Sequence, residues 1–223
     1  DTDPPVIDIT GPIAGDHVIS QVESGNPLEI SGTTTAENGQ IVTVTLDGNT
    51  YTATVTDGAW SLTVPEEDVQ GLSQGDLKIS ADVLDKAGNP ANDTHDIFVD
   101  TLPPVIDSVD AETDEDETVV FTWENFGITD ANTDVTKLIV SITTLPTDGV
   151  LYLNGEAVTL GTTMSYDDIQ AGRLTYVPNH NVSSDVAGRP LTNIGFSVSD
   201  GVNESTGSVD IVINAVADAP TID

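Results

Sequence analysis

Carboxylates are the residues whose number and grouping in this chain point to chemistry. The sequence has 38 Asp and Glu against 5 Lys and Arg, a formal net charge of −33 over 223 residues. Several acids cluster between apolar stretches, as in Glu112–Glu117 and Asp130-Ala-Asn-Thr-Asp134. Ca²⁺ takes roughly 6–8 such carboxylate and amide oxygens, whereas Mg²⁺ keeps its water and needs strict octahedral geometry. Without a cation, two carboxylates ~4 Å apart repel by about 4 kcal/mol at an effective dielectric of ~20.

A short segment recurs along the chain. Asp1–Asp8 reads Asp-Thr-Asp-Pro-Pro-Val-Ile-Asp, Asp100–Asp107 reads Asp-Thr-Leu-Pro-Pro-Val-Ile-Asp, and Asp218–Asp223 is a shortened copy. A header that returns at about the interval of one domain indicates a tandem array. Pro-Pro favours a stiff, extended backbone, so each header is expected to form a joint. We therefore expect two domains, residues 1–101 and 102–223, in an excerpt of a longer protein.

Alternation of apolar and polar residues with a period of two dominates residues 1–101, and this pattern predicts β-strands. Asp47-Gly48 and Asp57-Gly58 are typical of tight hairpin turns. Seven short antiparallel strands in about 100 residues are typical of an immunoglobulin-like β-sandwich. The expected strands are Val6–Thr10, Leu28–Gly32, Ile41–Leu46, Thr50–Val55, Trp60–Val64, Leu77–Leu84 and Thr94–Val99.

Residues 102–223 show the same alternation, so we expect a second antiparallel β-sandwich, end to end with the first. Ser165 is expected to cap a short helix, Tyr166–Ala171, that Gly172 ends. Asp167 and Asp168 suit the first turn of that helix, where the helix dipole favours acids. The expected strands are Val105–Val109, Val119–Trp123, Lys137–Thr144, Val150–Leu153, Leu174–Val177, Asn193–Val198 and Gly207–Ala215.

Strand parity decides which loops share an end of each sandwich. Because an up-and-down chain of seven strands starts at one end and leaves at the other, alternate loops gather beside each header. At the joint this gathers Asp16, Glu67, Asp68, Asp100, Asp130, Asn132, Asp134 and Asp200. At the chain ends it gathers Asp1 and Asp3 with Asp85 and Asn89, and the run Glu112–Glu117 with Asp185 and Asp218. We expect several Ca²⁺ ions, mainly at the joint and the chain ends; the alternative is that these acids are solvated turn formers.

Composition also bears on what the chain does not do. So negative a charge argues against non-specific binding to nucleic acid or to anionic membrane, both of which need basic surfaces. No apolar run approaches the ~18 residues of a membrane helix, no signal peptide is recognisable, and the absence of cysteine favours a bacterial extracellular protein. His17, His95 and His180 are far apart in sequence and no catalytic constellation is apparent, so we expect no enzyme. Trp60 and Trp123 are expected in the cores.

Several longer segments resemble a known group of proteins. The first domain resembles the bacterial immunoglobulin-like repeats of very large repeats-in-toxin adhesins, in Asp-Pro-Pro-Val-Ile (3–7), Ile-Ser-Gly-Thr-Thr (30–34), Asp-Gly-Ala-Trp-Ser (57–61) and Asp-Lys-Ala-Gly-Asn (85–89). The second resembles the cadherin-like repeats of the same adhesins, in Ile-Thr-Asp-Ala-Asn-Thr-Asp (128–134), Leu-Thr-Tyr-Val-Pro-Asn (174–179) and Val-Ser-Asp-Gly (198–201).

The resemblance implies calcium ligands at positions that match the cadherin-like pattern. These are Asp100, Asp130, Asp134 and Asp200 at the joint, and Glu115, Asp185 and Asp218 at the far end of the second domain. One segment departs from the pattern, because the long loop Pro178–Pro190 stands where the family usually has a short Asp/Gly turn. That departure puts the role of Asp185 in doubt.

The resemblance also implies a role outside the cell. It implies a calcium-rigidified extender, exported by a type I system to the bacterial cell surface, that spaces a distal ligand-binding module from the cell for adhesion or biofilm formation. Its partners would be neighbouring repeats of the same chain, and the excerpt itself would be a monomer. Two alternatives stay open: a sugar- or peptide-binding module of the same adhesin, and an accessory domain of a secreted, halophilic hydrolase.

Overall fold

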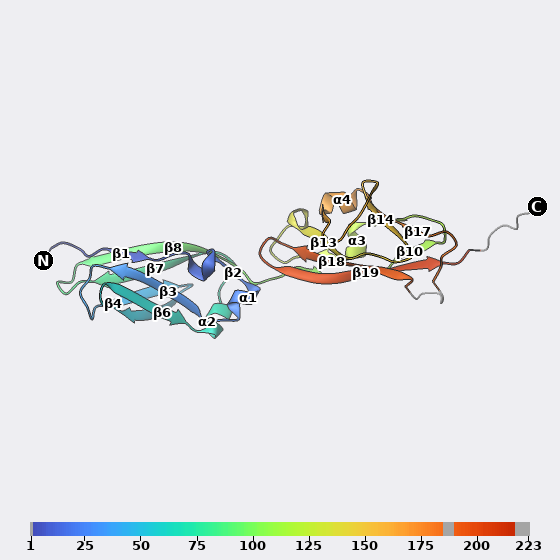
Figure 1. The fold of residues 1–223 in the computed structure, drawn as a ribbon. Coiled ribbons are helices and arrows are strands. Elements are labelled where there is room, and N and C mark those ends of the chain that lie inside the picture. The colour runs from blue at the N-terminus through green and yellow to red at the C-terminus, as the bar shows by residue number, and fades with distance from the viewer. Residues whose placement is uncertain (1, 185–189, 217–223) are drawn as a thin grey trace, which may run out of the picture. The chain divides into compact units, whose positions relative to one another are not determined.

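The chain folds into two compact units, Asp1–Thr101 and Leu102–Asp223, which we call the N-terminal and the C-terminal unit. The structure is a computed structural model that describes residues 2–184 and 190–216. Strands make up most of the regular structure in both units, so the expected all-β class is confirmed (Figure 1). Within the described residues, no helix has the length and apolar character needed to cross a membrane.

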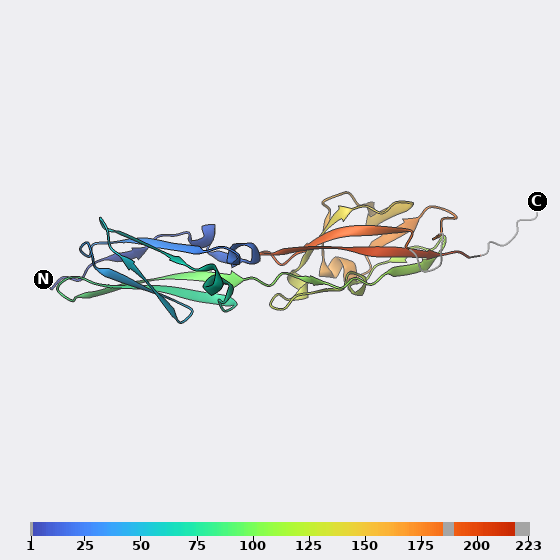
Figure 2. The ribbon, with the colours of Figure 1, turned by 90° about the horizontal axis from the view of Figure 1, so that it is seen from below.

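The N-terminal unit consists of two sheets that face each other (Figure 2). One has three strands in the order β1-β3-β6, and the other has five in the order β2-β8-β7-β4-β5. The strands are β1 (Ile7–Ile9), β2 (Val18–Ser20), β3 (Leu28–Thr34), β4 (Ile41–Leu46), β5 (Asn49–Thr54), β6 (Ala59–Val64), β7 (Gly75–Leu84) and β8 (Pro90–Asp100). Three short helical segments connect them: η1 (Ile13–Gly15), α1 (Gln21–Ser24) and α2 (Glu66–Gln70).

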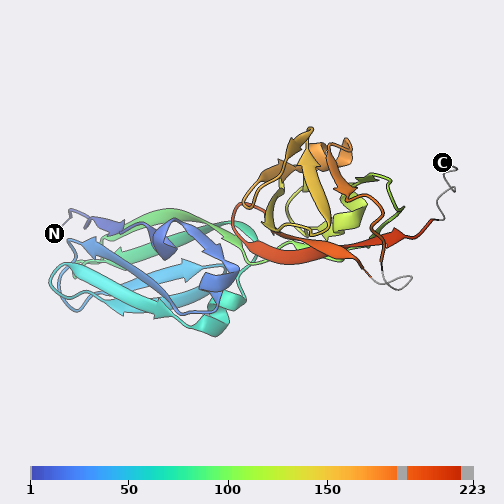
Figure 3. The ribbon, with the colours of Figure 1, turned by 45° about the vertical axis from the view of Figure 1, so that its right-hand side comes forward.

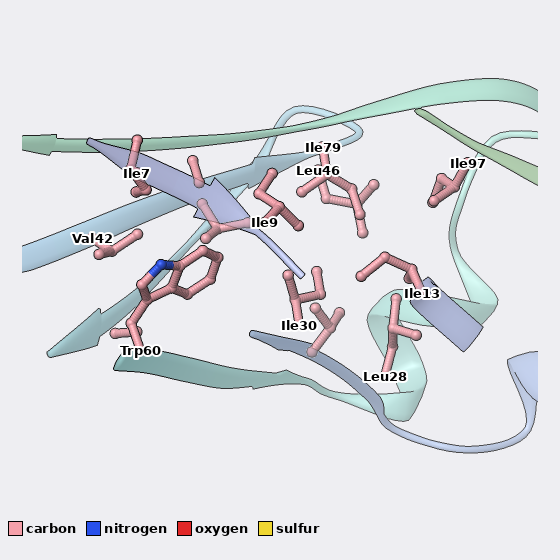
Figure 4. Packing of buried hydrophobic residues seen from close by; sticks show 14 of the residues in the cluster. Ile7, Ile9, Ile13, Leu28, Ile30, Val42, Leu46, Trp60, Ile79 and Ile97 are labelled. Atoms are coloured by element: carbon pink, nitrogen blue, oxygen red, sulfur yellow. The ribbon is translucent and has the colours of Figure 1, made fainter. Parts of the chain in front are cut away.

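Apolar side chains from alternate positions of both sheets fill the space between them. In β4, for example, Val42, Val44 and Leu46 are all fully buried. Trp60 is also buried, and its indole ring lies directly over Gly32, where any β-carbon would overlap the ring. Figure 4 shows the indole among the isoleucine and valine side chains of the opposite sheet. The expectation that Trp60 belongs to the core is confirmed.

The C-terminal unit has a five-stranded sheet in the order β10-β19-β18-β13-β16, a four-stranded sheet in the order β11-β17-β14-β15 and the pair β12-β9. The strands are β9 (Val105–Ile106), β10 (Ala111–Asp114), β11 (Val119–Val120), β12 (Ile128–Thr129), β13 (Ile139–Thr144), β14 (Gly149–Leu153), β15 (Glu156–Ala157), β16 (Thr163–Ser165), β17 (Leu174–Pro178), β18 (Thr192–Ser199) and β19 (Glu204–Asn214). The helical segments are α3 (Trp123–Phe126), η2 (Val135–Lys137) and α4 (Tyr166–Gln170).

Aromatic side chains form the centre of this second core. Phe126 of α3 lies 4.9 Å from Phe196 of β18, measured between ring centroids, and the two rings meet edge to face. Trp123 is buried, as expected, and its indole nitrogen donates a 3.0 Å hydrogen bond to the Ile128 carbonyl oxygen. Since α3 contacts both β19 and α4, it packs within the unit rather than lying on its surface (Figure 3).

Two sequence-based expectations for the C-terminal unit are wrong. The strand expected over Val119–Trp123 ends at Val120, because a capping box between Thr122 and Asn125 starts helix α3. The acidic run is not wholly a loop: its first residues belong to β10, which pairs with β19 in parallel. In the N-terminal unit β2 pairs with β8 in parallel as well, so each sandwich is antiparallel except at one edge. Helix α4 and its Ser165 cap are as expected.

Gly127 ends α3 in a conformation that only glycine adopts here without strain. Its φ is +60°, and an added β-carbon would overlap the carbonyl oxygen of Asp107, which is backbone and cannot turn away. The same place holds a backbone hydrogen bond from Asp107 N to Gly127 O, 3.0 Å long. Gly127 therefore allows α3 to turn directly into β12 beside β9.

We predict that Gly127→Ala lowers the free energy of unfolding of the C-terminal unit by about 2–4 kcal/mol, the sum of left-handed strain and steric overlap. Gly155→Ala is the matched control, because Gly155 has φ +82° but open space around its missing side chain. It should cost only about 1–2 kcal/mol. Urea denaturation of the two variants checks this. Equal losses of stability would show that the contact with Asp107 is unimportant.

Candidate functional site

The first expected group of ligands lies in the turn between β7 and β8. Asp85 is 9% exposed, and its two carboxylate oxygens accept hydrogen bonds from Asn89, one from the backbone N and one from Nδ2, both 2.8 Å long. The bond from the Asn89 side chain holds the pKa of Asp85 below its usual value. Asp3 is exposed, and Asp1 lies outside the described residues. The Asp85 carboxylate thus shapes its own turn.

The second group lies at the opposite end of the strands of the N-terminal unit. Asp16 is exposed and accepts a 3.0 Å hydrogen bond from Val18 N. Glu67 and Asp68 occupy the first turn of α2, and Asp68 Oδ2 accepts a 2.9 Å bond from the hydroxyl of Tyr51. Burial, and then this bond, raise the pKa of Tyr51 to about 12. Asp100, the last residue of β8, is only 3% exposed.

The third group belongs to the C-terminal unit, where the strand register places two loops at one end. Thr129 pairs with Val105, and Ile139 pairs with Ser199. The segment that starts at Asp130 therefore lies at the same end of the unit as the turn that starts at Asp200, beside the strand that follows the Pro-Pro header. Ser205 Oγ confirms how close that header is by donating a 2.6 Å hydrogen bond to Pro104 O.

In this third group each carboxylate uses Oδ1 to shape its own loop. Asp130 Oδ1 accepts bonds from the backbone N of Asn132 and Thr133, at 3.0 and 2.7 Å. Asp134 Oδ1 accepts bonds from the backbone N and the hydroxyl of Thr136, and these bonds hold its pKa below the usual value. Asp200 Oδ1 does the same for the turn at Val202, with a 2.7 Å bond.

The second oxygen of Asp130 stands out. Its Oδ2 atom is buried and accepts no hydrogen bond within the described part of the chain. The other buried side-chain atom without a partner there is Trp60 Nε1, in the first core. Leaving a carboxylate oxygen buried without a partner is unfavourable, and such atoms call for an explanation, of which a bound ion is one.

The fourth group lies at the other end of the C-terminal unit. Glu115 Oε1 accepts a 2.6 Å bond from Val216 N, so the acidic run grips the end of β19. Asp116 accepts bonds from His180 Nδ1 (2.7 Å) and from Asn181 N (2.9 Å), and the bond from His180 is the main reason that its pKa is below the usual value. Asp185 and Asp218, which the sequence places in this group, lie outside the described residues.

Over residues 2–184 and 190–216, no three His, Asp or Glu side chains are arranged so that they could hold one metal ion. The acids of each group share an end of a unit without converging on a point. The structure does bring together one pair that the sequence gave no reason to join: His17 and His95, 78 positions apart, lie within hydrogen-bond distance. Their contact depends on the parallel pairing of β2 with β8, which alternation in a three-residue strand does not reveal.

Comparisons with known proteins divide the chain in the same way. The model of a bacterial Ig-like domain family matches residues 7–101, and the model of the cadherin-like family matches residues 103–214. A comparison with curated protein sequences finds no match.

Several solved structures are similar to parts or all of the chain. A bacterial immunoglobulin-like domain from the M. primoryensis ice-binding adhesin is 29% identical, over 43% of this chain and 95% of its own, with a TM-score of 0.32. A structure from a 1.5-MDa bacterial ice-binding adhesin is 21% identical, over 99% of this chain and 68% of its own, with a TM-score of 0.46. A Ca²⁺-stabilised adhesin of an ice-binding Antarctic bacterium is 23% identical, over 96% of this chain and 50% of its own, with a TM-score of 0.41.

The family match carries the identification. Residues 103–214 make up half of the chain and include the loops that begin at Asp130 and Asp200. The matched region also includes the acidic run and the aromatic core around Phe126 and Phe196. The chain therefore belongs to the cadherin-like family, and a region matching the bacterial Ig-like domain family precedes its cadherin-like domain.

Proposed function

We propose that the chain is an extender segment of a large bacterial cell-surface adhesin, and that bound Ca²⁺ stiffens it. In this role it spaces a distal ligand-binding module from the cell and has neighbouring repeats of the same protein as its partners. The order of a bacterial Ig-like region and a cadherin-like domain supports this role. The recurrence of the Pro-Pro header at the start of each unit supports a tandem array.

The observation that carries the calcium proposal is the buried Oδ2 atom of Asp130, which accepts no hydrogen bond among the described residues. Its other oxygen is already fixed by two backbone N–H groups, so the carboxylate is held in place with one oxygen left over. A hard dication such as Ca²⁺ satisfies such an oxygen, because Ca²⁺ takes carboxylate oxygens in a flexible geometry. The residue types present therefore fit the ion.

Asp134 and Asp200 follow the same scheme and would complete the ligand set together with Asn132. In both, Oδ1 is engaged in the loop, so Oδ2 is the oxygen available to an ion. Since the three carboxylates do not converge on one point in the structure, we propose that binding draws the two loops together. The ion would supply positive charge that offsets the repulsion among these acids in a chain of net charge −33.

The remaining sequence-predicted ligands are proposed with distinct roles. Asp100, buried at the end of β8, is a candidate for a calcium ligand in the N-terminal unit. Glu115 is a candidate at the far end of the C-terminal unit, where it already contacts the end of β19. Asp85 and Asn89 are candidates that would have to exchange a hydrogen bond within their turn for the ion. The other proposed ligands are Asp1, Asp3, Asp16, Glu67, Asp68, Asp185 and Asp218.

We predict that Asp130→Asn weakens the binding of Ca²⁺ to the chain at least tenfold at its tightest site, a loss of about 1.4 kcal/mol. The variant removes the charge but keeps an oxygen that can accept the bonds from Asn132 N and Thr133 N. Isothermal titration calorimetry measures the effect. Asp148→Asn is the matched control, because Asp148 is an exposed loop acid with φ +56°, a conformation that Asn tolerates. Identical isotherms for wild type and Asp130→Asn would refute the site.

Removal of Ca²⁺ by excess EDTA is predicted to lower the melting temperature of the C-terminal unit. An ion that binds only the folded state stabilises it by about 2.7 kcal/mol at a free concentration 100 times the dissociation constant. Differential scanning calorimetry in 2 mM CaCl₂, a concentration of the order suited to extracellular calcium modules at ~10⁻⁴–10⁻³ M, checks this. If molar KCl in EDTA restored the melting temperature fully, general charge screening would account for the effect and the halophilic alternative would be favoured.

A further inference from the structure

Two histidine side chains meet on the N-terminal unit, away from all the acidic loops just described except for the neighbouring Asp16. Nδ1 of His17 and Nε2 of His95 are 2.7 Å apart, and the ring centroids are 4.7 Å apart with the planes tilted by 33°. His95 lies within β8, and His17 immediately precedes β2, which pairs with β8. Both rings are half-buried, so solvent reaches the pair.

The backbone around the pair holds the two rings in place. His17 has φ +72°, a left-handed conformation, and its carbonyl oxygen accepts a 2.9 Å bond from Phe98 N. Gly11 lies against both rings: an added β-carbon would be 2.9 Å from His17 Cε1 and 3.1 Å from His95 Cε1. A bulkier residue at position 11 would therefore push the rings apart. The two facing nitrogens are fixed by three separate segments of the chain.

Two imidazole nitrogens that face each other can share one proton or one metal ion. In the structure, one facing nitrogen must carry the proton that the other accepts. If each ring instead carries its proton on the outward nitrogen, both facing lone pairs are free to bind a metal, and the net charge is unchanged. Neutral imidazole is the commonest metal ligand and suits Zn²⁺, Cu²⁺ and Ni²⁺, whereas Ca²⁺ prefers oxygen.

The distance between the facing nitrogens is close to what one ion requires. With Zn–N bonds of about 2.0–2.1 Å and a tetrahedral angle, two ligand nitrogens lie about 3.3 Å apart, so the rings need to separate by about 0.6 Å. Rotation about χ2, which is a soft torsion for histidine, provides this movement. The described residues offer no third His or carboxylate in position to bind, so water would take the remaining sites on the ion.

We propose that His17 and His95 form a binding site for a borderline transition-metal dication, of which Zn²⁺ is the representative. The ion joins the segment before β2 to the long strand β8 and thereby stabilises the edge of the five-stranded sheet. The proposal concerns soft nitrogen ligands in the N-terminal unit, so it stands whether or not the acidic loops bind Ca²⁺. The strongly negative charge of the chain raises the local concentration of any dication.

The test is titration of the whole chain with ZnCl₂ by isothermal titration calorimetry, in 2 mM CaCl₂ so that oxygen sites are occupied by the harder ion. His17→Asn and His95→Gln each remove one nitrogen ligand, and Asn tolerates the left-handed backbone at position 17. His180→Gln is the matched control, because His180 lies on the C-terminal unit and contacts Asp116 instead. We expect one site that each of the first two variants weakens at least tenfold and that the control leaves unchanged.

A second readout separates binding by this pair from diffuse binding to carboxylates. In a nitrogen-15 spectrum of the imidazole side chains, Zn²⁺ should shift Nδ1 of His17 and Nε2 of His95 while leaving His180 in place. The melting temperature of the N-terminal unit should rise with Zn²⁺ in wild type and not in either single variant. Unchanged imidazole signals, or the same Zn²⁺ isotherm in wild type and both variants, would show that the rings only share a proton and would overturn the proposal.

Discussion

A carboxylate that leaves water must find other partners, and this constraint governs how the chain uses its 38 acids. Most partly buried acids satisfy it locally. Asp93 Oδ2 accepts a 2.8 Å bond from Ile9 N and so joins β1 to β8, and Asp68 accepts the Tyr51 hydroxyl. Asp130 satisfies it for one oxygen only. The unmet requirement of the second oxygen is the physical basis for a calcium ion at that loop.

The sandwich architecture turns this local requirement into a property of a whole end of a domain. Paired strands such as β13 and β18 end together, so the loops that follow them lie together as well. Rigid cores hold the strand ends in place: Val140 of β13 and Val198 of β18 are fully buried opposite each other. A cation that bridges two loops therefore acts on elements that are already fixed, and the loops alone need to adjust.

Alternation and turn chemistry made much of the fold predictable. The hairpin of β4 and β5 was readable from its period-two pattern and from Asp47-Gly48, whose φ values of +47° and +81° are those that the tight turn demands. The order of a bacterial Ig-like region and a cadherin-like domain was readable from longer segments and is confirmed. Helix α4 was readable because Ser165 is a strong cap.

What the sequence concealed depends on contacts between distant segments. Phe121 to Phe126 reads as apolar alternation, and only the cap at Thr122 and the left-handed Gly127 decide for a helix. The two parallel edge pairs involve strands of three and four residues, which are too short to show a period. The acids that share an end of a unit could be grouped by strand parity, but which oxygen of Asp130 is left without a partner requires atomic positions.

Small-angle X-ray scattering of the chain, first in about 2 mM CaCl₂ and then in excess EDTA, tests most directly whether Ca²⁺ stiffens it. The account predicts that removal of Ca²⁺ changes the radius of gyration and broadens the distribution of interatomic distances, because the loops that carry Asp130 and Asp200 lose the ion that holds them. Asp130→Asn should scatter in CaCl₂ as the wild type does in EDTA. Scattering curves that superimpose with and without Ca²⁺ would contradict the account and leave the acidic loops as solvated surface.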